Sequence, residues 1–402
     1  MRSSRKKVAS PSKTELQNKV LSRGVEDVID RKHLKKALSG GKKLRVKLGI
    51  DPTASDLHIG TAVVLRKLKQ FQDLGHKVVF IIGDFTAMVG DPSGQVSERK
   101  ALSKGEIKKN MKNYLSQAGK IIDIDKAEVR YNSEWLGRSV EEILELTKAA
   151  TINQVSERAD FQDRIKKHQK VSLMEALYPL LQGFDSVNIK ADVELGGTDQ
   201  LLNLLMGRQV QRYFGQAEQD VLTVPLLEGT DGVRKMSKSY NNYIGLDDKP
   251  NDMYGKVMSI NDSLISKYFE LCTDIPDKEI KSILKGRPRD AKARLAYEIV
   301  TIYHREEAAG KAEAEFNKVF RQKRLPTKIP VKNVKKGKFT LDELVVTIGA
   351  AKSKSEARRL IEQGAVRVDH ARSFIPKEEI TIPKGGILIQ VGKRVFVRAK
   401  KD

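Results

Sequence analysis

Residues 44–82 read as a strand, a loop, a helix and a second strand, and this order constrains the fold more than any other stretch. Apolar and polar side chains alternate from Leu44 to Ile50, as in a strand, and a loop follows. Apolar residues then recur at helical spacing up to Gly75, which suits a helix end: Val64, Leu68, Phe71 and Leu74. The run Val78 to Ile82 is typical of a strand buried in a parallel sheet. We therefore expect a right-handed β–α–β unit in a Rossmann-like α/β domain, with ligands beyond the carboxyl ends of the strands.

The pattern of this α/β domain continues downstream. Residues 100–180 are mostly helical, with a break near 129–135. We expect a strand near Val187 to Lys190, leading to the glycine-containing segment 194–200 and a leucine-rich helix. An apolar strand, Val221 to Leu226, then leads into a polar loop.

The C-terminal part reads differently. Residues 247–320 are helical and polar, and 321–338 read as a basic linker with two prolines. In the last module Ser353 has Glu356 three residues on, which is the spacing of a capping box before a helix ending at Gly364. Four short strands are expected after it: 366–368, 380–382, 387–391 and 395–397.

These patterns predict five parts in one chain. They are a basic leader with an N-terminal helix (1–43), the α/β domain (44–246), a helical domain (247–320), the linker (321–338) and a small α+β module (339–402). The basic leader lacks an apolar stretch after it, so a secretory signal is not expected.

Composition narrows the class of protein. The chain has 402 residues and a single cysteine, Cys272, which excludes an internal disulfide framework and favours the reducing cytoplasm. No apolar run approaches the length of a membrane span, and no cluster of histidines and cysteines has the spacing of a metal site. The net charge is +23, and more than half of this surplus lies between Arg321 and Asp402. Such a surplus favours a polyanionic partner.

Two segments 170 residues apart carry the chemistry. Lys235 and Lys238 lie on a short polar loop after an apolar strand, an arrangement that suits a mobile clamp on a phosphate chain. Upstream, Gly49 and Gly60 allow close approach of a nucleotide, and His58 stands at a helix entry, where anions bind.

The segments Leu48–Thr61 and Asp231–Asn242 resemble the HIGH and KMSKS motifs of class I aminoacyl-tRNA synthetases, and nearly the whole chain is similar to the bacterial tyrosyl-tRNA synthetase family. The resemblance implies activation of tyrosine with ATP and Mg²⁺, followed by transfer to the terminal adenosine of tRNA(Tyr), in a homodimer. It implies ATP-activating roles for Asp51, Thr53, His58, Lys235 and Lys238. Thr61 stands with His58 at the helix entry, where its hydroxyl can meet a phosphate oxygen. Gly49, Gly60, Gly197 and the ribose ligand Asp199 would complete the nucleotide site.

Selection of tyrosine is indicated by three polar residues on one stripe of an otherwise apolar helix. Tyr178, Gln182 and Asp185 stand at positions i, i+4 and i+7, and suit a pocket wall if a ligand supplies hydrogen-bond partners. The resemblance implies that Asp185 accepts from the phenol hydroxyl, while Tyr178 and Gln182 contact the amino-acid end. It also implies that Asp91 binds the α-amino group, with Thr86 close by, and that Asn132 and Gln200 belong to the pocket.

The segment Ser353–Val366 resembles a small RNA-binding domain shared with a ribosomal small-subunit protein of the S-four type. Four basic side chains on or beside its capped helix are expected to bind RNA phosphates: Lys352, Lys354, Arg358 and Arg359. Shape and backbone contacts of this kind suit structured RNA.

Two positions depart from the family pattern, and two alternatives stay open. Thr61 replaces the last histidine of the HIGH motif, and Lys47 stands where relatives have a second phenol-contacting tyrosine. Trp135 matches a position near the family's subunit interface. The first alternative is the sister enzyme for tryptophan, against which Asp185 argues. The second is a non-catalytic RNA-binding paralogue, which only Thr61 supports.

Overall fold

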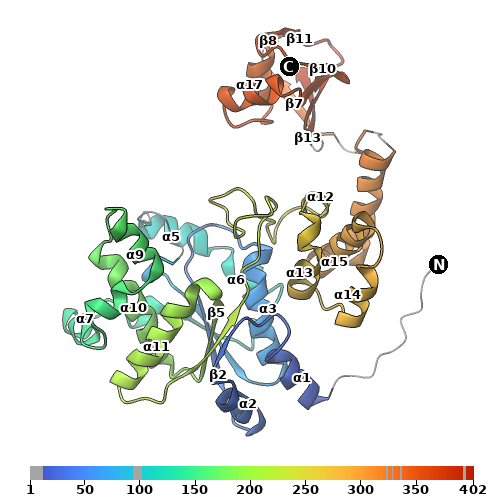
Figure 1. Cartoon of the computed structure of the whole chain (residues 1–402). Helices are drawn as coiled ribbons and strands as arrows, with labels where there is room; N and C mark the ends of the chain where they lie inside the picture. The colour runs from blue at the N-terminus through green and yellow to red at the C-terminus, as the bar shows by residue number, and fades with distance from the viewer. Residues whose placement is uncertain (1–11, 94–101, 323–324, 328, 336, 393–394) are drawn as a thin grey trace. The chain divides into compact units, whose positions relative to one another are not determined.

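The computed structural model describes residues 12–93, 102–322, 325–327, 329–335, 337–392 and 395–402. The chain divides into two compact units, residues 1–306 and 307–402, each described by itself below (Figure 1). The basic leader expected at residues 1–11 lies outside the described residues. Among the helices of the described ranges, none is both long and apolar enough to cross a membrane.

The first unit is built on a six-stranded sheet in the order β1-β6-β5-β2-β3-β4. Strands β2 to β6 are parallel, and β1 pairs antiparallel with β6 at the edge. The strands are β1 Val28–Ile29, β2 Arg45–Ile50, β3 Lys77–Ile82, β4 Glu128–Tyr131, β5 Val193–Gly197 and β6 Asp220–Val224. The order reverses between β2 and β5, and ligands of doubly wound sheets bind at such a switch point.

Helices cover both faces of this sheet, with α3 on one face and α10 and α11 on the other (Figure 1). The helices up to α11 are α1 Lys13–Val20, α2 Arg31–Ser39, α3 Ile59–Asp73, α4 Thr86–Val89, α5 Lys104–Met111, α6 Tyr114–Ala118, α7 Val140–Thr147, α8 Ile152–Ser156, α9 Ala159–Lys166, α10 Leu173–Ile189 and α11 Leu201–Tyr213. Two 3₁₀ turns, η1 Asn132–Glu134 and η2 Thr198–Gln200, follow β4 and β5.

The β–α–β unit predicted from residues 44–82 is confirmed as β2, α3 and β3. Leu65, Leu68 and Phe71 bury one stripe of α3 completely, which fixes the helix on the sheet. The helix ends before Gly75, whose φ of 88° is a left-handed conformation that glycine adopts without strain. The HIGH-like loop therefore leaves the carboxyl end of β2, as expected.

The prediction of a strand near Val187 to Lys190 is wrong. These residues form the end of α10, and the strand β5 begins only at Val193. Ser172 and Glu175 close a capping box at the start of α10, and its apolar face is buried as far as Ile189. A well-capped helix with a buried face overrides the weak strand propensity of a few β-branched residues.

A helical region follows the KMSKS-like loop, in agreement with the polar helical pattern of 247–320. It consists of α12 Pro250–Met258, η3 Asp262–Leu264, α13 Ile265–Cys272, α14 Asp277–Ile283 and α15 Pro288–Phe316. Arg305 interrupts α15 with non-helical backbone angles, next to the boundary between the two units. A π-helical turn, η4 Asn317–Arg321, ends this run.

The second unit contains a five-stranded sheet in the order β10-β9-β12-β13-β7, a β8–β11 pair and two helices. The elements are β7 Val331–Val334, β8 Lys338–Thr340, α16 Leu341–Thr347, α17 Lys354–Glu362, β9 Val366–Val368, β10 Ala371–Ser373, β11 Glu379–Thr381, β12 Ile387–Val391 and β13 Val395–Lys401. The four strands expected after the capped helix are confirmed, with β11 one residue earlier and β13 continuing to Lys401, whereas β10 was not expected. The stretch expected as a linker contributes β7, which pairs with β13 through backbone hydrogen bonds that its charged, exposed sequence does not reveal.

Candidate active site

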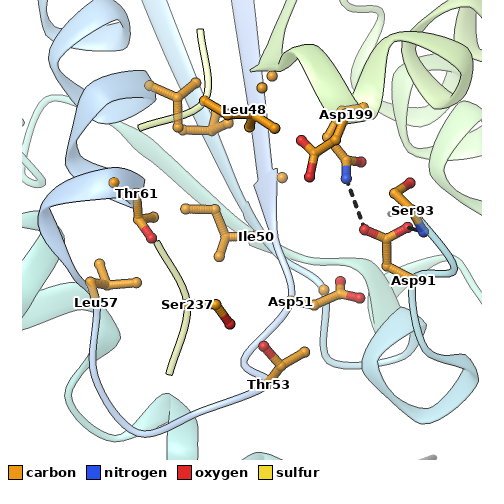
Figure 2. Close-up of a pocket in the computed structure, with 18 of the residues that line it drawn as sticks. Leu48, Ile50, Asp51, Thr53, Leu57, Thr61, Asp91, Ser93, Asp199 and Ser237 are labelled. Atoms are coloured by element: carbon orange, nitrogen blue, oxygen red, sulfur yellow. Dashed lines mark hydrogen bonds between the residues drawn. The ribbon is translucent and has the colours of Figure 1, made fainter. Parts of the chain in front are cut away.

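A cavity of about 360 Å³ lies at the carboxyl ends of the parallel strands of the first unit. Its walls come from the ends of β2, β5 and β6, the start of α3, the inner face of α10 and the loop 235–239. In Figure 2, Leu57 and Thr61 lie on one side, and Asp91, Ser93 and Asp199 on the other. Sixteen of the residues expected in the site line it: Gly49, Asp51, Thr53, His58, Gly60, Thr61, Thr86, Asp91, Tyr178, Gln182, Asp185, Gly197, Asp199, Gln200, Lys235 and Lys238.

His58 caps α3 at the entrance to the pocket. Its Nδ1 accepts a hydrogen bond from the backbone N–H of Thr61 at 3.2 Å, which leaves Nε2 as the protonated nitrogen. Burial, and then the charges of Lys238 and Lys235, lower the pKa of His58 to about 4. The imidazole is therefore a neutral donor at physiological pH. The Cβ of any residue replacing Gly60 would lie about 3.0 Å from His58 Nδ1, so glycine keeps this entry open.

The loop that carries Lys235 and Lys238 is held by ion pairs with two carboxylates and by hydrogen bonds to one buried side-chain amide. Lys235 Nζ lies 2.6 Å from Asp199 Oδ2, and Lys238 Nζ lies 2.7 Å from Asp56 Oδ2. Asn242, which is buried, accepts from the backbone N–H of Ser237 and donates to the carbonyl of Lys235. Both ammonium groups thus reach the cavity mouth, where a phosphate chain would need them.

One part of the cavity wall is built around Asp51 and Asp91. Asp51 accepts from the Tyr178 hydroxyl at 2.9 Å and from Thr86 Oγ1 at 2.7 Å. Burial, then the charges of Asp51 and Asp91, raise the pKa of Tyr178, so its phenol remains a donor. Asp91 accepts from Gln200 Nε2 at 2.8 Å, which fixes one carboxylate oxygen at the cavity surface.

A polar cluster that the sequence did not reveal supports Asp91 from behind. Asn203 on α11 donates to Asp91 Oδ1 at 3.4 Å and to Ser93 Oγ at 3.1 Å. The buried Arg158 in turn donates to Asn203 Oδ1 at 2.7 Å and pairs with Asp160. A carboxylate held on several sides is suited to binding a cation such as an α-ammonium group.

Asp185 is a buried carboxylate in the wall of the same cavity. Its Oδ1 accepts from the Trp135 indole N–H at 2.8 Å and its Oδ2 from Asn132 Nδ2 at 3.4 Å. Burial raises the pKa of this carboxyl to about 6, against the lowering effect of Lys47. Asn132 lies behind the wall, where it also donates to Thr86 Oγ1.

Trp135 and Lys47 make buried contacts that the sequence did not predict. Trp135, expected near a subunit interface, is buried within the unit and donates to Asp185. Lys47, which the sequence left outside the site, is also fully buried, and its Nζ lies 2.8 Å from Glu194 Oε1. A tryptophan three residues after Asn132, on a turn that follows a strand, was the available signal for the first. A lysine within an apolar strand was the signal for the second.

In the second unit, the four basic residues expected to bind RNA lie on or next to α17. Lys354 pairs with Glu343, and Arg358 Nε lies 2.8 Å from the buried carboxylate of Asp342. Lys352 and Arg359 are exposed. The surface is basic at the start and the outer face of the helix, where a polyanion would meet it.

Comparison with known proteins agrees with this fold. Residues 39–321 match the family described as tRNA synthetases class I (W and Y), and residues 340–381 match the S4 domain. The chain therefore belongs to the class I tRNA synthetases. Within that class its relatives are tyrosine–tRNA ligases: that of Thermotoga maritima is 50% identical, covering 96% of this chain and 97% of the relative, and that of Moorella thermoacetica is 48% identical, covering 95% of each.

The fold is also that of solved tyrosyl-tRNA synthetases. A C-terminally truncated mitochondrial tyrosyl-tRNA synthetase of Aspergillus nidulans superposes with a TM-score of 0.64 at 22% identity, covering 77% of this chain and 95% of the other. At that identity the likeness supports the architecture alone.

Proposed function

We propose that the chain is a tyrosine–tRNA ligase that makes tyrosyl-adenylate in the cavity of the first unit and then charges tRNA(Tyr). The observation that carries this proposal is the buried carboxylate of Asp185 in the wall of a cavity that Lys235 and Lys238 also line. The carboxylate of Asp185 can accept a hydrogen bond from a phenol hydroxyl. Phenylalanine cannot donate this bond, so it leaves a buried acceptor unpaired and should bind more weakly than tyrosine.

In the first step an oxygen of the tyrosine carboxylate attacks the α-phosphorus of ATP, and the bond to the β-phosphate breaks to release pyrophosphate. The neutral His58 and the hydroxyl of Thr61 donate to phosphate oxygens, as does Thr53, and Lys235 and Lys238 stabilise the charge on the leaving group. Asp51 lies among these residues, between Tyr178 and Thr86. We assign alignment of the two reactants to the rigid walls of the cavity.

Binding of the two substrates divides along the cavity. Asp199 would accept from the ribose hydroxyls, with Gly49, Gly60 and Gly197 allowing close approach of the nucleotide. Asp91 and Gln200 would take the α-ammonium group of tyrosine, with Thr86, Tyr178 and Gln182 beside them and Asn132 supporting Asp185. Mg²⁺ enters as part of the ATP substrate and neutralises phosphate charge.

In the second step a hydroxyl oxygen of the terminal adenosine of tRNA attacks the acyl carbon, and AMP leaves with the bonding electron pair. We assign tRNA binding in part to Lys352, Lys354, Arg358 and Arg359 of the S4 domain. We place the enzyme in the cytoplasm, where its product is used. We also propose the five-part domain organisation that the sequence predicts.

We propose that the functional particle is a homodimer. Large apolar side chains are exposed on four consecutive helices, α7 to α10, and soluble proteins seldom leave so many on one region. They are Val140, Leu144, Ile152, Ile165, Leu173 and Met174. Sedimentation velocity of the full chain tests this, and Leu144→Asp should shift it towards the monomer.

The function is tested by amino-acid-dependent exchange of pyrophosphate into ATP, with tyrosine, phenylalanine and tryptophan offered separately. Exchange with tyrosine alone supports the proposal. Exchange with tryptophan would favour the sister enzyme, and no exchange by a protein that binds tRNA would favour the non-catalytic paralogue.

A further inference from the structure

A buried ion pair lies directly behind the helix that carries the tyrosine-binding residues. Lys47 Nζ on β2 is 2.8 Å from Glu194 Oε1 on β5, and 0% and 1% of the two side chains are exposed. The cavity itself is lined by their sequence neighbours Leu48 and Leu195. Removing two charges from water is costly unless their remaining hydrogen bonds are also made.

Most of those hydrogen bonds are made with Gln182 and Ser186, which lie on one turn of α10. Lys47 Nζ donates to the carbonyl of Gln182 and to Ser186 Oγ, both at 2.8 Å. Glu194 Oε1 accepts from the Gln182 side chain at 3.0 Å, and its Oε2 accepts from Ser186 Oγ at 3.2 Å and from Gln219. The pair therefore holds Gln182 by its main chain and by its side chain at once.

The same turn presents Asp185 to the cavity. The charged or titratable groups that face Asp185 are Lys47 from β2, Glu194 from β5 and Tyr178 from α10 itself, and neutral donors reach it from Trp135 and Asn132. Lys47 favours the ionised form of Asp185, and Glu194 opposes it. Two acidic groups and one lysine thus share this dry region.

We propose that Lys47 and Glu194 are positioning residues for tyrosine: together they fix the α10 turn that carries Gln182 and Asp185, and they set the charge that Asp185 experiences. This inference rests on the proposed function, because it assigns a role in binding tyrosine. Lys47 has this role without touching the substrate.

Three variants test the charge relation: Lys47→Met, Glu194→Gln and the double variant with both changes. The readout is kcat/KM for tyrosine in pyrophosphate exchange, measured from pH 5 to 8, together with KM for ATP. In the double variant the new amide at position 194 can donate to the acceptors that Lys47 leaves, so the region stays neutral and hydrogen-bonded.

The two single variants should shift the acid limb of the pH profile, where kcat/KM for tyrosine falls at low pH, in opposite directions. Lys47→Met leaves Glu194 uncompensated beside Asp185, so the acid limb of the profile should move up by about one pH unit, and KM for tyrosine should rise at least ~10-fold. Glu194→Gln leaves Lys47 uncompensated, so the acid limb should move down. The double variant should return it towards wild type, and KM for ATP should change less than ~2-fold throughout.

Lys67→Met is the matched control, because Lys67 is also buried but binds carbonyl oxygens behind α3. It should leave both the acid limb and KM for tyrosine unchanged. Wild-type protein without tyrosine-dependent exchange would refute the proposed function itself. Active wild type with single variants whose acid limbs do not move, or move the same way, would refute this inference; if Lys47→Met does not fold, the direction of the Glu194→Gln shift decides.

Discussion

Lys235 Nζ lies 2.6 Å from Asp199 Oδ2, so the side chain that should stabilise pyrophosphate is paired with the side chain that should hold the ribose. Both groups are only partly exposed, at 29% and 21%. ATP cannot bind to both as proposed until this ion pair has separated. Part of the binding energy of the nucleotide is therefore used to move the loop 235–239.

This relation predicts a split between kcat and KM for Lys235→Gln. Loss of one cation that stabilises the leaving pyrophosphate should lower kcat of pyrophosphate exchange about 100-fold. KM for ATP should fall rather than rise, because Asp199 no longer has to release a partner. Arg234→Gln is the control, because Arg234 is exposed on the same loop and pairs with Asp231. A rise of KM for ATP in Lys235→Gln would contradict the competition.

Asp185 predicts how tyrosine use depends on pH. Its pKa is raised to about 6 by burial, so the carboxylate that accepts from the phenol is lost as the pH falls below about 6. We expect kcat/KM for tyrosine to fall there, and the same fall should be missing in Asp185→Asn. His58 does not explain a change in this range, because burial lowers its pKa to about 4. A profile that is flat down to pH 5 would be inconsistent with this role.

The same raised pKa predicts that Asp185 lowers the free energy of unfolding of the protein at neutral pH. Its pKa in the folded state lies above the ordinary aspartate value of 3.8, so the folded state binds the proton more tightly and the free energy of unfolding falls as the pH rises from about 4 to 6. At pH 7 the free energy of unfolding of Asp185→Asn should therefore exceed that of wild type by up to about 3 kcal/mol, with little difference at pH 4. Calorimetry at both pH values measures this difference. If Asp185→Asn were less stable than wild type at pH 7, burial of the ionised carboxylate would not be costing stability.

The features that the sequence predicted correctly are those encoded over short distances. The β2–α3–β3 unit and the strands β9, β11, β12 and β13 of the second unit follow from hydrophobic periodicity and glycine positions. The strand expected near Val187 was wrong because the capping box at Ser172 and the buried face of α10 decide that segment, and both lie outside a window of four residues.

The candidate site was predictable as far as its motifs extend. What the sequence missed are partners distant in the chain: Trp135 binds Asp185 across 50 residues, and Lys47 binds Glu194 on another strand. A lysine in an apolar strand does not disclose which carboxylate will neutralise it, because only the strand order β5–β2 brings the two together.

Thr61 is the position at which the HIGH motif departs from its family. Its Oγ1 lies 3.4 Å from His58 Nδ1 at the cavity wall, so a longer donor there would reach further towards the phosphates. We expect Thr61→His to raise kcat of pyrophosphate exchange, by ~3 kcal/mol of transition-state stabilisation at most. Thr61→Val, which keeps the shape and removes the hydroxyl, should lower it. Equal rates for all three would mean that this position takes no part in the reaction.

Arg358 and Arg359 are neighbours on α17 with different surroundings, and this separates RNA binding from stability. Arg359 is exposed, whereas Arg358 pairs with buried Asp342, whose pKa is lowered to about 2 by Thr340 and Arg358 although burial opposes this. Arg359→Gln should weaken tRNA binding and reduce the slope of log K against log salt by about 0.7–0.9, as for one lost phosphate contact. Tyrosine-dependent pyrophosphate exchange, which needs no tRNA, should be unchanged. Arg358→Gln should in addition lower the unfolding temperature, because it removes a partner of Asp342. If Arg359→Gln binds tRNA with an unaltered salt slope, the outer face of α17 does not contact the RNA backbone.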